Sequence, residues 1–205
     1  QVMPRESALY LQDKMEFDDM VINIGLRYDA FDPASVYPSD RRNPANQLVL
    51  PDSMTSTYDQ APVINQLSPR IGFAYQLGDQ AVLHFSYGHF FQMPPLYAMY
   101  QNHSFLVGTD DHGTTMGNVL LEPEKTITYE LGLWQELIRG LNLDVALFYR
   151  DIYNLLSAQV ISTYNQIEYG LYSNKDYGNV RGLELKLDMG VGLLKGIVNY
   201  TLQYT

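Results

Sequence analysis

The chain has 205 residues, of which 13 are basic and 23 acidic, giving a formal net charge of −10. This acidity argues against nucleic-acid binding, which depends on Lys and Arg side chains that neutralise phosphates. The absence of cysteine excludes disulfides and cysteine-based metal sites. The sequence contains no run of about 18 apolar residues, so it predicts no transmembrane helix.

Eight short segments alternate apolar and polar residues, which is the pattern of strands whose successive side chains point to opposite faces. The segment 180–188 shows this most clearly, with Leu183, Leu185 and Leu187 opposite Gly182, Glu184 and Lys186. In chain order the predicted strands cover residues 7–16, 20–29, 69–77, 81–90, 126–134, 141–150, 180–188 and 196–204. Most are close to the length of roughly 9 to 11 residues that crosses a bilayer as a tilted strand.

The connectors between these strands alternate strictly between short and long. The short ones, at 17–19, 78–79, 138–140 and 190–194, are built around the Gly and Asp residues that tight turns favour. The long ones cover 31–68, 91–123 and 156–178. Short turns on one side and long loops on the other are typical of a transmembrane barrel, so we predict an all-β, antiparallel up-and-down transmembrane β-barrel.

The two predicted faces differ in chemistry. The apolar face carries Leu, Ile, Val, Phe and Tyr with almost no charge, as lipid requires. Many of the 17 tyrosines lie near strand ends, where a membrane interface places them, among them Tyr28, Tyr87, Tyr149, Tyr153 and Tyr204. The other face carries the charges that we expect to line a wet lumen, principally Arg27, Arg70, Glu130, Asp144, Arg150, Glu184 and Lys186. A soluble lipocalin-like barrel, with its apolar face turned inward, remains an alternative.

The direction of the meander places both chain ends on the side of the long loops. A complete outer-membrane barrel ordinarily begins and ends in the periplasm, so we expect an internal slice of a larger barrel. Taken alone, eight strands would form an open sheet with two unpaired edges and a lipid-facing apolar surface.

Five phrases occur in order and together resemble the β-barrel of TonB-dependent outer-membrane receptors. They are SPRIGFAY at 68–75, VLHFSYGHFF at 82–91, LEPEKT at 121–126 leading to YELG at 129–132, FYRDI at 148–152, and NVRGLE at 179–184. The resemblance covers essentially the whole chain. It implies that residues 1–205 are about eight strands of a 22-stranded barrel, without the N-terminal plug domain or the TonB box.

The resemblance implies a location in the Gram-negative outer membrane and active import of a scarce, bulky ligand such as a ferric siderophore, cobalamin or an oligosaccharide. The partners would be outer-membrane lipid, the protein's own plug, the TonB complex that relays the proton-motive force, and the imported ligand. A passive porin or an outer-membrane adhesin would share the same strand rhythm. A soluble all-β ligand-binding domain is a third possibility.

A ligand surface is predicted in the middle long loop. Pro95 suits the first turn of a short helix, which would place Tyr97 and Tyr100 on one face, with His103 close behind. We expect these three residues to line the binding vestibule, although the helix could equally pack against neighbouring loops.

No catalytic or metal-binding motif appears. The stretch 108–113 contains Asp110, Asp111 and His112, but no HExxH or EF-hand spacing is present, nor a GxSxG elbow. The sequence therefore predicts a protein that is not an enzyme and that has no cofactor and no metal site.

Overall fold

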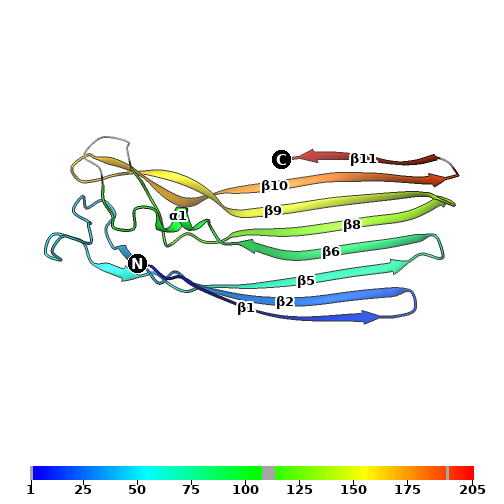
Figure 1. The fold of residues 1–205 in the computed structure, drawn as a ribbon, viewed down its shortest axis with the longest axis horizontal. Coiled ribbons are helices and arrows are strands. Elements are labelled where there is room, and N and C mark those ends of the chain that lie inside the picture. Colours follow the sequence, from blue (N-terminus) through cyan, green and yellow to red (C-terminus); the bar gives the residue numbers. More distant parts are fainter. Residues whose placement is uncertain (1, 108–113, 193) are drawn as a thin grey trace.

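The computed structural model describes residues 2–107, 114–192 and 194–205. Its main element is one antiparallel sheet in which eight strands follow one another in the order β1-β2-β5-β6-β8-β9-β10-β11 (Figure 1). These strands are β1 (Arg5–Glu16), β2 (Met20–Asp32), β5 (Ile64–Gln76), β6 (Ala81–Gln92), β8 (Glu124–Ile138), β9 (Leu141–Ser162), β10 (Glu168–Val191) and β11 (Leu194–Tyr204). The predicted all-β, up-and-down architecture is confirmed.

Three further strands and one helix lie at the end of the sheet that carries the long connectors. β3 (Val36–Pro38) and β4 (Tyr58–Gln60) pair with each other as a small ribbon, and β7 (Thr115–Met116) adds to β10 in parallel. The helix α1 (Leu96–Tyr100) starts directly after Pro95, as predicted. Figure 1 shows the tight turns gathered at the opposite end, where Gly78 and Gly140 adopt positive φ angles of 66° and 83°.

The predicted strand boundaries were too narrow, and the third long connector was wrong. β9 and β10 have 22 and 24 residues and form one extended hairpin. Most of 156–178, predicted as a loop, belongs to these two strands, which pair from Leu156 up to Ser162 and Glu168. Two register irregularities, between Asn174 and Asp176 and between Asp176 and Gly178, interrupt the alternation there, and this explains why the polar segment resembled a loop.

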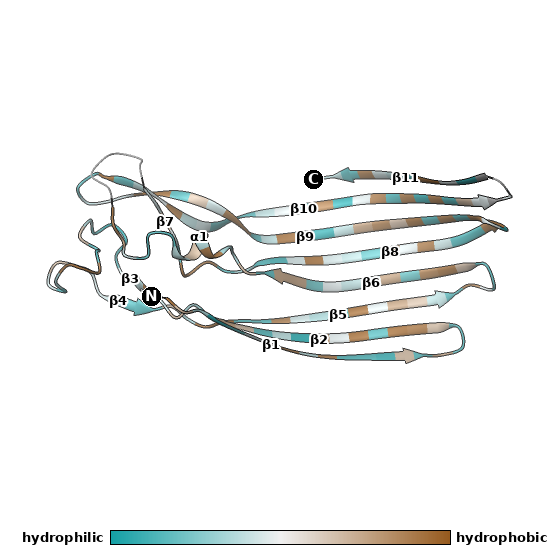
Figure 2. Ribbon diagram, viewed as in Figure 1, coloured by the Kyte–Doolittle hydropathy of each residue, from teal (hydrophilic) through white to brown (hydrophobic). Residues whose placement is uncertain are grey.

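The sheet itself has no buried core, because both faces are open in this 205-residue chain. Figure 2 shows polar and apolar residues alternating along each strand. Large side chains on the predicted apolar face are exposed to a degree unusual for a folded domain, such as Leu131 at 45% and Leu147 at 53%. The two strands at the ends of the order, β1 and β11, each leave one edge unpaired, so no closed barrel forms within these residues.

Apart from Phe148 of β9, the buried apolar residues lie mostly among the long connectors. One cluster joins Phe31 of β2 to Ala98 and Met99 of α1 and to Leu121, and a second joins Phe105, Met116, Tyr169 and Leu171. The connectors therefore form a packed layer of their own above the strands. In the described residues no helix is long and apolar enough to span a membrane.

Two aromatic rings fill the space above glycines on neighbouring strands. A Cβ built on Gly132 would lie 2.1 Å from the His84 ring, and one on Gly182 would lie 2.5 Å from the Phe148 ring. His84 and Phe148 are the direct cross-strand partners of these glycines. The Phe148 ring thus takes the space that the missing side chain of Gly182 leaves.

Candidate functional site

The polar residues of adjacent strands line up in register across one face of the sheet. Gln12, Gly25, Arg70, Gly88, Thr128 and Arg150 are successive cross-strand partners on β1, β2, β5, β6, β8 and β9. Because partners in register share a face, one row brings Arg70 and Arg150 to the same side of the sheet. We call this side the hollow face, since it carries a wide depression.

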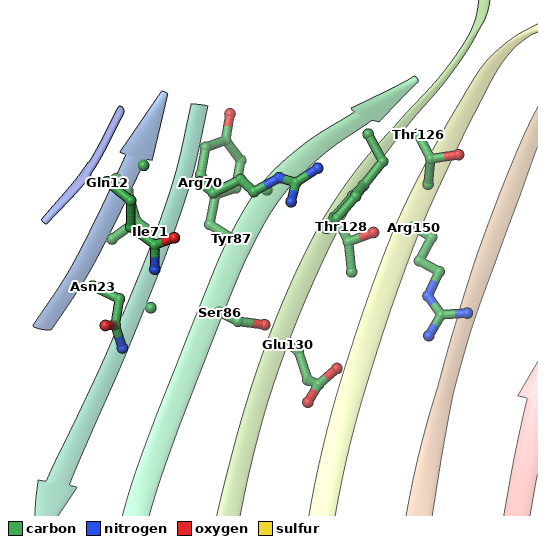
Figure 3. A pocket seen from close by; sticks show the side chains of 14 residues that line it. Gln12, Asn23, Arg70, Ile71, Ser86, Tyr87, Thr126, Thr128, Glu130 and Arg150 are labelled. Carbon is green, nitrogen blue, oxygen red and sulfur yellow. The ribbon is translucent and has the colours of Figure 1, made fainter. Parts of the chain in front are cut away.

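The depression, here called the wall groove, has a volume of about 650 Å³. Arg70, Ser86, Thr128, Glu130 and Arg150 project into it in Figure 3. Its full lining is Gln12, Asn23, Gly25, Arg70, Ile71, Gly72, Ser86, Tyr87, Gly88, Phe90, Thr126, Thr128, Glu130 and Arg150. Three of the predicted wall charges, Arg70, Glu130 and Arg150, are thus brought together. Arg27 borders two smaller depressions beside Arg70.

The charged groups of the hollow face differ in their partners. Arg27 is neutralised by Asp29, with Nη2 to Oδ1 at 2.7 Å, and Glu130 lies 3.9 Å from the His84 ring nitrogen. The guanidinium groups of Arg70 and Arg150 have no ion-pair or hydrogen-bond partner among the described residues. Each lies instead over an aromatic ring, Arg70 over Phe90 at 4.5 Å and Arg150 over Phe148 at 4.9 Å.

The other three predicted wall charges lie outside the wall groove, closer to the tight turns. Lys186 is the cross-strand partner of Asp144. Glu184 lies two residues before Lys186 on the same strand and on the same face. One carboxylate oxygen of Asp144 is buried without a hydrogen-bond partner in the described residues. Glu184 and Lys186 are both exposed.

The predicted vestibule residues lie in the packed layer of connectors but do not form one surface. The Tyr100 hydroxyl donates to the backbone oxygen of Pro33 at 2.9 Å, and its ring packs on the buried cluster around Phe31. Burial raises the pKa of Tyr100 to about 12. Tyr97 is 58% exposed and contacts the Tyr172 ring edge-on at 5.8 Å, and His103 is exposed on the following turn. Tyr97 and His103 are therefore exposed to a ligand, whereas Tyr100 is held in the packed layer.

A hydrogen-bond network around Asn118 joins the three predicted connectors. The sequence pattern did not indicate this network. The Asn118 side chain accepts from Arg41 Nη2 at 2.8 Å and donates to the backbone oxygen of Tyr172 at 2.9 Å. The Tyr169 hydroxyl donates to the backbone oxygen of Arg41 at 2.7 Å. Burial lowers the pKa of the Arg41 guanidinium, because desolvation disfavours its charged form.

Tyrosines form a row on the opposite, apolar face of the sheet. Tyr87, Tyr129 and Tyr149 are successive cross-strand partners, and their ring centroids are separated by 5.0 and 6.2 Å. Just toward the connectors, Asp151 accepts hydrogen bonds from Tyr149, Tyr177 and Asn179. The apolar face thus ends in tyrosines and polar groups, as expected where a wall leaves the lipid.

The residues weighed as a metal-binding stretch, Asp110, Asp111 and His112, lie outside the described residues. Among the residues that are described, no group of three His, Asp or Glu side chains converges as a metal site.

Comparison with known protein families gives one match over nearly the whole chain. Residues 4–205 match the family model described as "TonB dependent receptor-like, beta-barrel". A search among curated proteins found no match.

Solved structures with the same fold cover almost all of this chain. The FrpB iron transporter from Neisseria meningitidis matches with a TM-score of 0.65 and 16% identity over 99% of this chain and 26% of its own. The siderophore receptor PirA from Pseudomonas aeruginosa gives 0.66 and 19% over 98% of this chain and 34% of its own. A double mutant of the Serratia marcescens hemophore receptor HasR, in complex with its hemophore HasA and heme, gives 0.68 and 20% over 98% and 34%.

These identities are low, so the structural matches show the shared fold alone. The chain spans about a quarter to a third of the length of these similar structures, between 26% and 34%.

Proposed function

This chain belongs to the TonB-dependent receptor-like β-barrel family, and we propose on that basis that it forms part of the wall of an outer-membrane importer. The family consists of transporters and receptors rather than enzymes. We propose that residues 1–205 are a section of a 22-stranded barrel in the Gram-negative outer membrane, and that a plug domain and a TonB box lie elsewhere in the full-length protein.

The observation that carries the proposal is the match of residues 4–205 to the family model, and the geometry of the two faces supports it. The face with exposed Leu131 and Leu147 suits lipid, and the face with Arg70, Glu130 and Arg150 suits an aqueous interior. A soluble barrel would turn its apolar residues toward the hollow side instead.

The proposed cargo is a scarce, bulky ligand taken up with energy relayed by TonB. A ferric siderophore is favoured over cobalamin or an oligosaccharide because the similar structures are described as an iron transporter, a siderophore receptor and a hemophore receptor with heme. Tyr97, with Tyr100 and His103 beside it, is the proposed contact on the outer side.

The test is uptake of radioactive iron from a panel of siderophores by cells that lack other iron-chelate receptors and carry the full-length protein. We expect uptake of at least one complex, lost when the TonB gene is deleted or a protonophore is added. Uptake that persists in both conditions indicates a passive porin. No uptake by any cell line that displays the receptor contradicts import of iron complexes.

A further inference from the structure

The β9–β10 hairpin contains two bulges at the level where it leaves the wall. On β9 the extra residue lies within 153–154, and on β10 it is Lys175. The two bulges cancel, so the pairing above them resumes in the register that it has below them. Bulges bend a strand and increase its twist, and Figure 1 shows the two strands twisting toward the tip of the hairpin. The hairpin therefore changes direction here without losing its pairing.

Asn154 lies in the bulge of β9 and has a positive φ of 62°. Asparagine adopts this left-handed conformation more readily than most residues do. Its side-chain amide donates to Glu122 Oε2 at 3.0 Å and to the backbone oxygen of Pro123 at 3.2 Å. Asn154 therefore holds the segment that leads into β8.

Asn174, beside the bulge of β10, binds the same segment. Its side-chain oxygen accepts from the backbone N–H of Glu122 at 2.8 Å, and its nitrogen donates to the backbone oxygen of Glu122 at 3.0 Å. The same nitrogen donates across the hairpin to the backbone oxygen of Asn154 at 2.8 Å. The Asn174 amide thus satisfies both backbone polar groups of one residue, as a neighbouring strand would. We call Asn154, Asn174 and Glu122 the hairpin clamp.

The hairpin clamp is connected to α1 through the segment that ends at Glu122. The backbone N–H of Asn118 donates to the backbone oxygen of Ala98 in α1 at 2.8 Å. Leu121 is buried in one cluster with Ala98 and Met99. Because Glu122 follows Leu121 directly, the hairpin clamp holds α1 at a fixed place against the hairpin.

This connection brings Tyr97 of α1 against Tyr172 of β10. Their rings meet edge-on, with centroids 5.8 Å apart and planes at 70°. Tyr172 lies two residues before Asn174, and its backbone oxygen accepts from the Asn118 side chain at 2.9 Å. Edge-on contacts depend on the distance and angle between the rings. The two elements that carry these rings must therefore be fixed relative to each other, and the hairpin clamp is placed to fix them.

We propose that Asn154 and Asn174 are positioning residues that act through Glu122 to set the direction of the β9–β10 hairpin. The hairpin clamp thereby holds Tyr172 in contact with Tyr97. This inference rests on the proposed function, in which Tyr97 is the outer contact for the cargo, and it makes Tyr172 the second ring of that contact. Loss of the hairpin clamp separates the two rings and weakens cargo binding, while the wall below the bulges keeps its pairing.

The test places 3-fluorotyrosine at position 172 of the full-length receptor in detergent and records its fluorine NMR resonance. A neighbouring aromatic ring shifts this resonance, so Tyr97→Leu gives its position without the ring contact. Asn174→Ala and Asn154→Gly should each move the resonance at least half of the way toward that position. Asn154→Gly permits the positive φ and removes only the amide, so its effect is separate from backbone strain.

Asn179→Ala is the matched control, because Asn179 is another asparagine of β10 and its amide binds Asp151 on the wall below the bulges. It should leave the resonance at its wild-type position. Two results overturn the proposal: an unchanged resonance in both clamp variants, or an equal displacement in Asn179→Ala.

The uptake assay then tests whether the ring contact serves the cargo. With a radioactive iron complex that the wild type imports, Asn174→Ala should raise the half-saturating concentration severalfold and leave the maximal rate unchanged. An unchanged half-saturating concentration overturns the role in cargo binding. The fluorine resonance is recorded without cargo, TonB or cells. A receptor that imports no iron complex therefore contradicts the proposed function, whereas an unchanged resonance contradicts the hairpin clamp alone.

Discussion

At the scale of single residues, the strongest constraint in the wall is the fit of an aromatic ring over a glycine on the next strand. The space above Gly132 is filled by His84 alone, whose ring atoms would lie 2.1 to 3.0 Å from a Cβ. Real Cβ atoms are not found at such distances, so the pair behaves as one packing unit. The sequence placed His84 and Gly132 on the polar face, but their meeting depends on strand register, which it did not specify.

The first prediction concerns this pair. Gly132→Ala should lower the unfolding free energy of the full-length receptor by about 1 to 3 kcal/mol, because the added methyl group overpacks the His84 ring. His84→Ala in the same molecule should restore most of the loss, which a double-mutant cycle in urea measures as a coupling energy.

Gly196→Ala is the control for this prediction, since a Cβ at Gly196 meets no atom of the described residues within 4 Å. If Gly132→Ala and Gly196→Ala change stability by the same amount, or if His84→Ala gives no relief, the packing explanation is wrong.

The second prediction concerns Tyr97, the exposed tyrosine of α1. Tyr97→Ala should weaken binding of the siderophore identified by the uptake test by about tenfold or more, because its exposed ring is available for stacking. Tyr164→Ala removes another exposed tyrosine ring, which lies beside Arg42 near the tip of the β9–β10 hairpin, and should have little effect. Fluorescence titration of the purified receptor gives both affinities, and equal affinity in wild type and Tyr97→Ala excludes the contact.

The third prediction uses the raised pKa of Tyr100, about 12 against an ordinary value of 10. The packed tyrosine keeps its proton between pH 10 and 12, where an unfolded one loses it. Its stabilising contribution is therefore complete below pH 10 and is lost as pH rises through about 12. Tyr100→Phe removes the bond to Pro33 and this pH dependence. Hydrogen exchange in α1 should differ between wild type and variant at pH 9, and the difference should shrink toward pH 12; a constant difference argues against the assignment.

At the scale of elements, the connectors form a folded layer and are more than links between strands. Asn118 holds Arg41 from the first connector and the backbone of Tyr172 from β10, while Tyr169 holds the backbone of Arg41. Gly117 also packs directly against the backbone of Met99 and Gln101 in and after α1. Opening one connector should therefore loosen the others.

The fourth prediction tests this coupling. Asn118→Ala should increase protease cleavage within 39–60 severalfold, although the substituted residue is far away in sequence, because a hydrogen bond to a charged group contributes about 1.5 to 3 kcal/mol. Asn179→Ala also removes side-chain hydrogen bonds but lies on the wall, and should leave cleavage at 39–60 unchanged. Mass spectrometry of limited digests locates the cuts; cleavage confined to the neighbourhood of 118 would show that the connectors open independently.

Sequence alone predicted the existence and order of the strands because each alternating segment carries its own two-residue period. The prediction of strands was wrong where this period is interrupted. The register of β10 shifts around Asp176, and the part of the β9–β10 hairpin between this residue and its tip was predicted as a loop. The wall groove was predicted only in part, because Arg70 and Arg150 share a row through four strands whose offset depends on the connectors. The hydrogen-bond network around Asn118 corresponds to no periodic pattern in the sequence, so it could not be predicted.

At the scale of the whole molecule, the two faces of the sheet differ in chemistry. Leu131 on β8 is 45% exposed on the apolar face, and Thr128 on the same strand lines the wall groove. The polar face needs no apolar environment, and the apolar face has nothing within the described residues to cover it. This asymmetry supports a wall that separates lipid from an aqueous interior.

The fifth prediction follows from the asymmetry. Leu131→Arg should reduce the stability of the full-length receptor in bilayers by about 2 to 4 kcal/mol, the cost of a lipid-facing arginine near the midplane. Thr128→Arg, three residues away on the other face, should cost far less. Folding into phospholipid vesicles, followed by the electrophoretic shift of unheated barrels, measures both; equal losses would mean that the two faces meet similar surroundings.

The strictly sequential strand order also limits how many strands can be added to or removed from the sheet. Each strand between β1 and β11 pairs with the strands before and after it in this order, so the wall can lengthen or shorten at either edge without rearranging its middle. Adding or removing a hairpin, two strands at a time, keeps every tight turn on one side and every long connector on the other. A single extra strand would invert the sidedness of all that follows. The strand numbers of related barrels are thus expected to differ by even numbers.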